Sequence, residues 1–220
     1  MNADFWNPIL LSVKISIIST MIVLCVGLFF SKMLLRKGPT RKGKVIELIL
    51  LIPLVLPPSV TGLILITWLG NNSAPGKVIA YIFGQGIMFT WWAGVLAAAV
   101  VTFPLMYQAL KLGLSSIDGE IKGAALVDGA GPWNLFWLIE LPLMAKSILT
   151  GVVLSFARGL GEFGATLMFA GNIPGETQTA STAIYTAIEV GDVQKAWIWA
   201  GALTILSFIL LYIIQWMQRE

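Results

Sequence analysis

Five long runs of apolar residues, separated by shorter polar segments, dominate the pattern of the chain. Each run has about the 20 residues that a helix needs to cross the hydrocarbon core of a bilayer. We therefore expect an all-α polytopic membrane protein with about five transmembrane helices, over residues 8–30, 45–69, 88–110, 147–170 and 196–217. Residues 77–86 are apolar but too few to span, so they form either an interfacial piece or an early start of the third span.

The composition excludes an ordinary soluble domain. Apolar residues make up 57% of the 220 residues and charged residues only 11%, against about 45–50% and about 25% in soluble domains. Histidine is absent and the one cysteine, Cys25, lies in an apolar run. We therefore expect no metal site, no catalytic residue and no disulfide. Residues 1–220 are expected to form a single transmembrane domain without a phosphate-binding loop of its own, so any ATPase is a separate chain.

Basic residues are concentrated in one of the predicted loops. Six of them surround the end of the first span and the start of the second: Lys32, Arg36, Lys37, Arg41, Lys42 and Lys44. Loops rich in Lys and Arg stay in the cytoplasm, so we expect the amino terminus outside and the carboxyl terminus inside the plasma (inner) membrane. The net charge of +3 is small and indicates this sidedness rather than a nucleic-acid partner.

The cytoplasmic loop over residues 113–145 is expected to hold more structure than a plain connector. Ser115 and Ser116 are placed to cap a short helix that stops at Gly129. A second amphipathic helix is expected over residues 133–140, until Leu141 and Pro142. Apolar side chains on such exposed helices indicate docking to a partner groove or to the lipid interface.

The same loop carries a spaced motif. It consists of Gly123, Ala124 and Ala125, then three residues, Gly129, nine residues, and Ile139, Glu140, Leu141 and Pro142. This spacing resembles the E-A-A-x3-G-x9-I-x-L-P loop of ABC importer permeases, with Gly123 in place of the glutamate. The resemblance implies that the short helix inserts into a cleft of the ATPase subunit. Either Glu120 or Asp128 is then left to supply the missing charge.

Further segments resemble the molybdate permeases among the ABC importers. They read LIPLVLPPSVTG over residues 51–62, GEFGATL over 161–167 and GNIPGETQT over 171–179, in a chain shorter than the sulfate permeases. The resemblance implies a type I importer permease that pairs with a second copy of itself and lies in membrane lipid. Its partners would be two ATP-binding subunits, which bind ATP and Mg, and an extracytoplasmic molybdate-binding protein. This chain itself would hold no cofactor and would not be an enzyme.

Alternatives to molybdate import stay open at this level. The same architecture serves tungstate, or sulfate and thiosulfate, because the binding protein largely sets that choice. An ATP-independent channel or secondary transporter predicts a coupling-ion site and often an inverted repeat, and we find neither in the sequence. A membrane enzyme would need an assembled set of acid–base or metal-binding residues in the spans, and the sequence contains none.

The fourth apolar run carries two charges at membrane depth. Arg158 and Glu162 are four residues apart, which places them on one face of a continuous helix. They form either a neutralising pair that faces the bundle interior or part of an anion path, and both can hold. Small residues around them permit close helix packing at the dimer axis. The candidate residues of the path or gate are Ser59, Thr61, Arg158, Gly161, Glu162, Gly164 and Thr166.

Two further segments shape this picture. Pro53, Pro57 and Pro58 are expected to bend the second span, next to the hydroxyls of Ser59 and Thr61, which are able to donate to oxyanion oxygens. Residues 171–179 form a turn-rich outer loop. The resemblance implies that this loop meets the binding protein or shapes the outer gate, with Asn172, Pro174 and Thr177 as candidate contacts.

Overall fold

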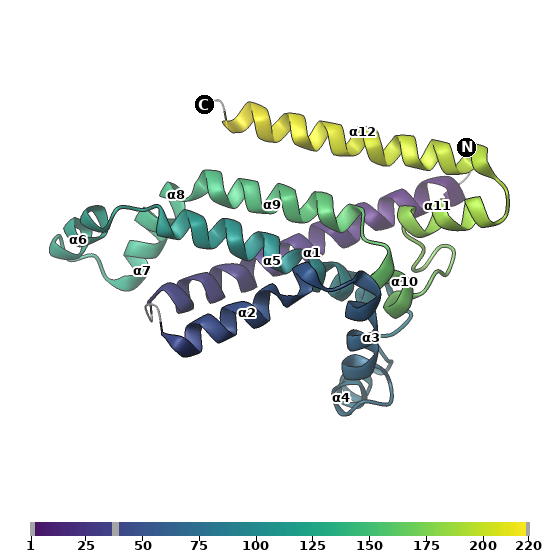
Figure 1. The fold of residues 1–220 in the computed structure, drawn as a ribbon, viewed down its shortest axis with the longest axis horizontal. Coiled ribbons are helices and arrows are strands. Elements are labelled where there is room, and N and C mark those ends of the chain that lie inside the picture. Colours follow the sequence, from purple (N-terminus) through teal and green to yellow (C-terminus); the bar gives the residue numbers. More distant parts are fainter. Residues whose placement is uncertain (1–2, 37–39, 219–220) are drawn as a thin grey trace.

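The computed structural model describes residues 3–36 and 40–218, and every regular element in these two stretches is helical. Among the described residues, three helices contain a segment long and apolar enough to cross a membrane: α1 (Ala3–Arg36), α5 (Trp91–Ser115) and α12 (Val193–Gln218). In Figure 1, α1, α5 and α9 (Ala145–Leu160) pack lengthwise against one another and α12 runs along their side. The predicted all-α membrane fold is confirmed.

The second predicted span is divided into two helices. Between α2 (Arg41–Val55) and α3 (Pro58–Leu69) the helix direction bends by 117°. Leu56 is extended, with ψ 140°, because a residue that precedes a proline is driven out of the helical region. Pro58 then starts α3 at a position where its missing N–H is not needed. The prolines thus produce the expected bend in the segment over residues 45–69, and they divide it into two helices.

The fourth predicted span is also interrupted. α9 ends at Leu160, and α10 (Gly164–Ala170) begins only after a three-residue break. The break is a tight turn in which the amide of Glu162 donates to the carbonyl of Gly159 at 3.1 Å. A continuous helix over residues 147–170 is therefore wrong, because hydropathy alone does not distinguish an unbroken apolar helix from two apolar pieces.

Two shorter helices complete the arrangement on the side away from the long cytoplasmic loop. α4 (Ala74–Phe83) is capped by the Ser73 hydroxyl, which accepts from the amide of Gly76 at 2.9 Å. It ends at Gly84, whose φ of +72° is left-handed, so residues 77–86 belong to a separate helix and do not start the third span early. α11 (Ala180–Glu189), for which no helix was predicted, packs against α12 and the start of α1.

Small residues allow the long helices to approach closely around α5. Ala93, Ala97 and Ala98 of this helix are fully buried. A Cβ atom placed on Gly27 of α1 would lie 2.9 Å from Leu110, and one on Gly151 of α9 would lie 2.9 Å from the sulfur of Met106. Inside a bilayer, helices associate through such close packing, because lipid tails are as apolar as the side chains.

The contact between α3 and α10 depends on Gly62. A Cβ atom at this position would lie 2.9 Å from Cβ of Met168 and 3.2 Å from Cα of Ala165. We expect Gly62→Val to destabilise the protein by about 1–3 kcal/mol, the usual cost of overpacking. The measurement is the melting temperature of the purified protein in detergent.

The matched control for this change is Gly201→Val in α12. A Cβ atom there meets no other atom within 4 Å, while the intrinsic cost of a β-branched residue in a helix is the same at both positions. Equal losses of melting temperature in the two variants would contradict the packing account of α3 and α10.

Candidate functional site

The cytoplasmic loop folds into a short helix with defined ends. α6 (Gly119–Val127) is capped by Asp118, whose Oδ1 accepts from the amide of Glu120 at 2.9 Å. The expected cap by Ser115 or Ser116 is wrong, because α5 continues to Ser115, and Ser116 donates to the carbonyl of Gly113 at 2.9 Å. Both serines thus belong to the end of the preceding membrane helix.

The predicted stop of this helix at Gly129 is confirmed. Gly129 has φ +86°, a conformation that favours glycine. The amide of the next residue, Ala130, donates to the carbonyl of Ala125 at 2.9 Å, which closes the carboxyl end of the helix as in a Schellman motif. Asp128 forms the C-cap and is exposed.

The second helix of the loop is longer than expected and unusual in winding. Three segments follow one another without a break: α7 (Pro132–Asn134), the π-helix η1 (Leu135–Glu140) and α8 (Leu141–Leu143). The expected end at Leu141 and Pro142 is wrong, since the helical winding continues to Leu143. π-Helical turns are rare and occur frequently at functional sites. Ile139 and Leu141 are half-buried here, whereas Pro142 is exposed.

α6 projects from the end of the helix bundle, as Figure 1 shows, and most of its residues are exposed. Ala125 is its only buried side chain, while Leu126 is 54% and Val127 88% exposed. Gly123 and Ala124 lie on the exposed part of the same helix. A Cβ atom on Gly123 would meet nothing within 4 Å, so the glutamate of the family pattern would fit there sterically.

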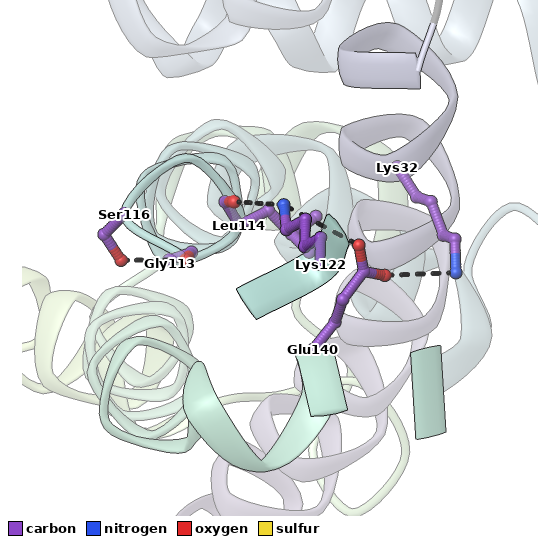
Figure 2. A network of polar contacts seen from close by, with 6 residues as sticks. All are labelled: Lys32, Gly113, Leu114, Ser116, Lys122 and Glu140. Atoms are coloured by element: carbon purple, nitrogen blue, oxygen red, sulfur yellow. Dashed lines mark hydrogen bonds and ion pairs between the residues drawn. The ribbon is translucent and has the colours of Figure 1, made fainter. Parts of the chain in front are cut away.

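A group of ionic contacts attaches this loop to the membrane helices; we call Lys32, Leu114, Lys122 and Glu140 the Glu140 network (Figure 2). The Glu140 carboxylate, 10% exposed, pairs with Lys32 of α1 at 3.2 Å and with Lys122 of α6 at 3.7 Å. Lys122 also donates to the carbonyl of Leu114 near the end of α5, at 3.2 Å. Two cations compensate this nearly buried carboxylate, which would otherwise be costly to desolvate.

The Glu140 network was not predicted from the sequence. Glu140 occupied the variable position of the motif and was given no role, although it is the only charged residue between Gly129 and Ala145. Lys32 was interpreted only as a marker of the cytoplasmic side. An isolated charge in an apolar helical segment was the available signal, since such a charge needs a partner.

A second ion pair lies at the break between α9 and α10. Nη1 of Arg158 is 2.8 Å from Oε2 of Glu162, and the side chains are 36% and 1% exposed. The pair is confirmed, but its placement on one face of a continuous helix is wrong, because Glu162 follows the end of α9. Oε1 of Glu162 accepts from the amide of Ala165 at 3.0 Å and so caps the start of α10.

The structure brings only some of the other path candidates together. A Cβ atom on Gly164 would lie 3.0 Å from Cβ of Pro58 and 3.5 Å from the amide nitrogen of Ser59, so α10 and α3 begin side by side. Ser59 and Gly161 are exposed near this contact.

The two remaining path candidates, Thr61 and Thr166, are buried in this chain, at 3% and 1% exposed. Thr166 lies beside Gly94 of α5, where a Cβ atom would be 3.7 Å from its methyl group.

The outer loop over residues 171–179 is held by its own polar contacts. Thr177 is 1% exposed, and its hydroxyl accepts from the amide of Ile173 at 2.9 Å. Nδ2 of Asn172 donates to the hydroxyl of Thr186 in α11 at 2.7 Å. Among the three candidate contacts, Pro174 is exposed, Asn172 is half-buried and Thr177 is buried.

One tyrosine of α11 lies beside a carboxylate. The carboxylate of Glu189 raises the pKa of Tyr185, chiefly by a hydrogen bond and then by charge repulsion. Within residues 3–36 and 40–218, His, Cys, Asp and Glu form no group of three or more that could hold a metal ion.

Comparison with known proteins agrees with this architecture. A crystal structure of a bacterial ABC transporter involved in import of the acidic polysaccharide alginate superposes with a TM-score of 0.79, over 100% of this chain and 80% of that one. At 15% identity this likeness shows the fold alone.

Sequence relatives are much closer. A Bacillus subtilis (strain 168) transport system permease protein is 47% identical over 213 residues, 97% of this chain and 93% of that protein. The molybdenum transport system permease protein of Escherichia coli (strain K12) is 42% identical over 219 residues, with the same coverage. The family model for the inner membrane component of binding-protein-dependent transport systems matches residues 23–219. The chain therefore belongs to the family of binding-protein-dependent transport system inner membrane components.

Proposed function

We propose that this chain is the membrane-spanning permease subunit of an ATP-driven importer that carries molybdate. The substrate assignment rests on the 42% identity to the E. coli protein named for molybdenum transport, over nearly the whole of both chains. It is supported by the segments over residues 161–167 and 171–179, which resemble molybdate permeases. Permeases of this kind carry out no covalent chemistry, and ATP and Mg would be bound by a partner.

The observation that carries the coupling role is the geometry of α6. A helix that is capped at both ends, has one buried side chain and exposes Leu126 and Val127 is built to dock into a groove of another protein. We infer that each of two copies of this chain presents α6 to one ATP-binding subunit. The motif residues Gly123, Ala124, Ala125, Asp128 and Gly129 form or end this helix.

We infer the orientation in the membrane from the basic residues at the α6 end of the molecule. Figure 1 shows the end of α1 and the start of α2 at the same end of the bundle as α6 and α7. Four lysines lie at this end, on α1, α2, α5 and α6: Lys32, Lys44, Lys111 and Lys122. A membrane protein keeps such a basic end in the cytoplasm. The amino terminus is then outside, and the outer loop with Pro174 at its exposed part faces the extracytoplasmic molybdate-binding protein.

The path itself would run where α3 and the α9–α10 break meet, at the interface between the two copies. Arg158 is partly exposed there and pairs with Glu162, so the site combines an accessible guanidinium with nearly neutral net charge. Modest fixed charge suits an oxyanion that must enter and leave, because strong binding would slow its release. Closure of the ATPases on α6 would shift the bundle and open this region outward.

Uptake of radioactive molybdate tests the proposed function. A deletion strain is expected to lose molybdate uptake at scarce supply and to regain it when the chain is restored. Excess sulfate should compete only weakly. Unchanged molybdate uptake together with lost sulfate uptake would contradict the assignment of molybdate as the substrate and leave the importer architecture in place.

The exposed fractions of Arg158 and Glu162 predict an asymmetric response to substitution. Arg158→Ala leaves the nearly inaccessible Glu162 carboxylate without its cation, which is unfavourable in a buried place. Adding Glu162→Gln removes that charge and keeps an oxygen for the amide of Ala165. We therefore expect the double variant to melt at a higher temperature than Arg158→Ala alone, with a coupling of about 0.5–3 kcal/mol. Strictly additive losses would contradict the pairing.

A further inference from the structure

α6 is attached to the rest of the protein by few packing contacts. Only Ala125 is buried, and a cavity of about 370 Å³ lies beside the helix, lined in part by Leu126, Pro132 and Leu135. A helix held this loosely next to open space is able to swing without moving the bundle. A specific link is therefore needed if its motion is to reach the membrane helices.

The Glu140 network supplies such a link, as Figure 2 shows. The carboxylate of Glu140 contacts Lys122 of α6 on one side and Lys32 of α1 on the other. Lys122 in turn reaches the carbonyl of Leu114 in the last turn of α5. One carboxylate thus joins the docking helix to the cytoplasmic ends of two membrane-spanning helices.

The two halves of the network differ in strength. Lys32 lies 3.2 Å from the carboxylate and 3.8 Å from the centroid of the Phe136 ring in the same π-helix, so the ion pair and a cation–π contact both hold η1 against α1. Lys122 makes the longer contact, at 3.7 Å. α6 is therefore tied through Lys122 to a π-helix that Lys32 holds against α1, so a displacement of α6 acts on Glu140 through this ion pair.

We propose that Glu140 is a positioning residue that transmits the motion of α6 to α1 and α5. This inference rests on the proposed function, because it requires an ATPase that moves α6. Glu140 acts through Lys32 and Lys122 and does not contact the transported ion. Without the charge of Glu140, α6 would move into the adjacent cavity, and ATP would be hydrolysed without rearrangement of the bundle.

The test uses the complete transporter in liposomes, with its ATP-binding subunits and binding protein, and compares Glu140→Gln with Glu140→Asp. The matched control is Glu47→Gln. Glu47 pairs with Lys111 near the same end of the molecule, but this pair joins α2 to α5 and does not involve the loop. The readouts are molybdate imported per ATP hydrolysed and the melting temperature of each complex.

We expect Glu140→Gln to lose most of the import per ATP while hydrolysis continues and the melting temperature stays near that of Glu47→Gln. Glu140→Asp keeps the charge and should retain import, because the lysine stems are flexible. A merely structural role would lower melting temperature and hydrolysis together and leave the ratio unchanged. That result would overturn the proposal.

A second readout does not depend on the transported ion. In a Cys25→Ser background, a cysteine placed at the exposed Ser59 reports rearrangement near α3 through its rate of reaction with a water-soluble maleimide. ATP should change this rate in the otherwise unchanged transporter and in Glu47→Gln, but not in Glu140→Gln.

The two readouts separate the two proposals. If the transporter fails to import molybdate but Glu140→Gln still abolishes the ATP-dependent change, the proposed substrate is wrong and the role of Glu140 stands. If ATP alters the rate equally in Glu140→Gln and Glu47→Gln, the role of Glu140 is wrong. If ATP alters the rate in none of the three transporters, no ATP-driven rearrangement reaches α3, and both proposals are wrong.

Discussion

Close helix packing around α5 is the constraint on which the rest of the structure depends. In lipid, apolar side chains gain little by leaving their surroundings, so helices must fit closely to associate. The alanines of α5 and the glycines of α1 and α9 that face it bring the backbones together. This rigid group of three helices gives fixed positions to the two features that matter for transport, the cytoplasmic loop and the break between α9 and α10.

Both features use a shielded carboxylate with a cationic partner. Glu140 faces two lysines at the cytoplasmic end, and Glu162 faces Arg158 at the helix break. In each case the cation is more exposed than the carboxylate, so the positive group keeps part of its hydration while the negative group does not. Ion pairs of this kind contribute little net stability, but loss of the cation leaves a shielded carboxylate uncompensated, which is costly. Such pairs suit residues that fix the relative position of separate helices.

The sequence predicted the parts of the fold that depend on local chemistry. Gly129 ends α6 as expected because a left-handed turn favours glycine, and the prolines at 57 and 58 bend the second span as expected. The break after Leu160 was missed because apolar residues continue on both sides of it. The roles of Glu140 and Thr177 were missed because each depends on contacts across the loop that spacing along the chain does not reveal.

The central claim is that α6 docks to an ATP-binding subunit on the cytoplasmic side. Its most direct test is thiol labelling of Val127→Cys in a Cys25→Ser background, since Val127 is 88% exposed in this chain alone. Inside-out membrane vesicles are labelled with an impermeant maleimide before and after addition of the ATP-binding subunit. The account predicts rapid labelling that the added subunit strongly slows. Labelling at the same rate with and without the subunit, or labelling from outside in intact cells, would contradict it.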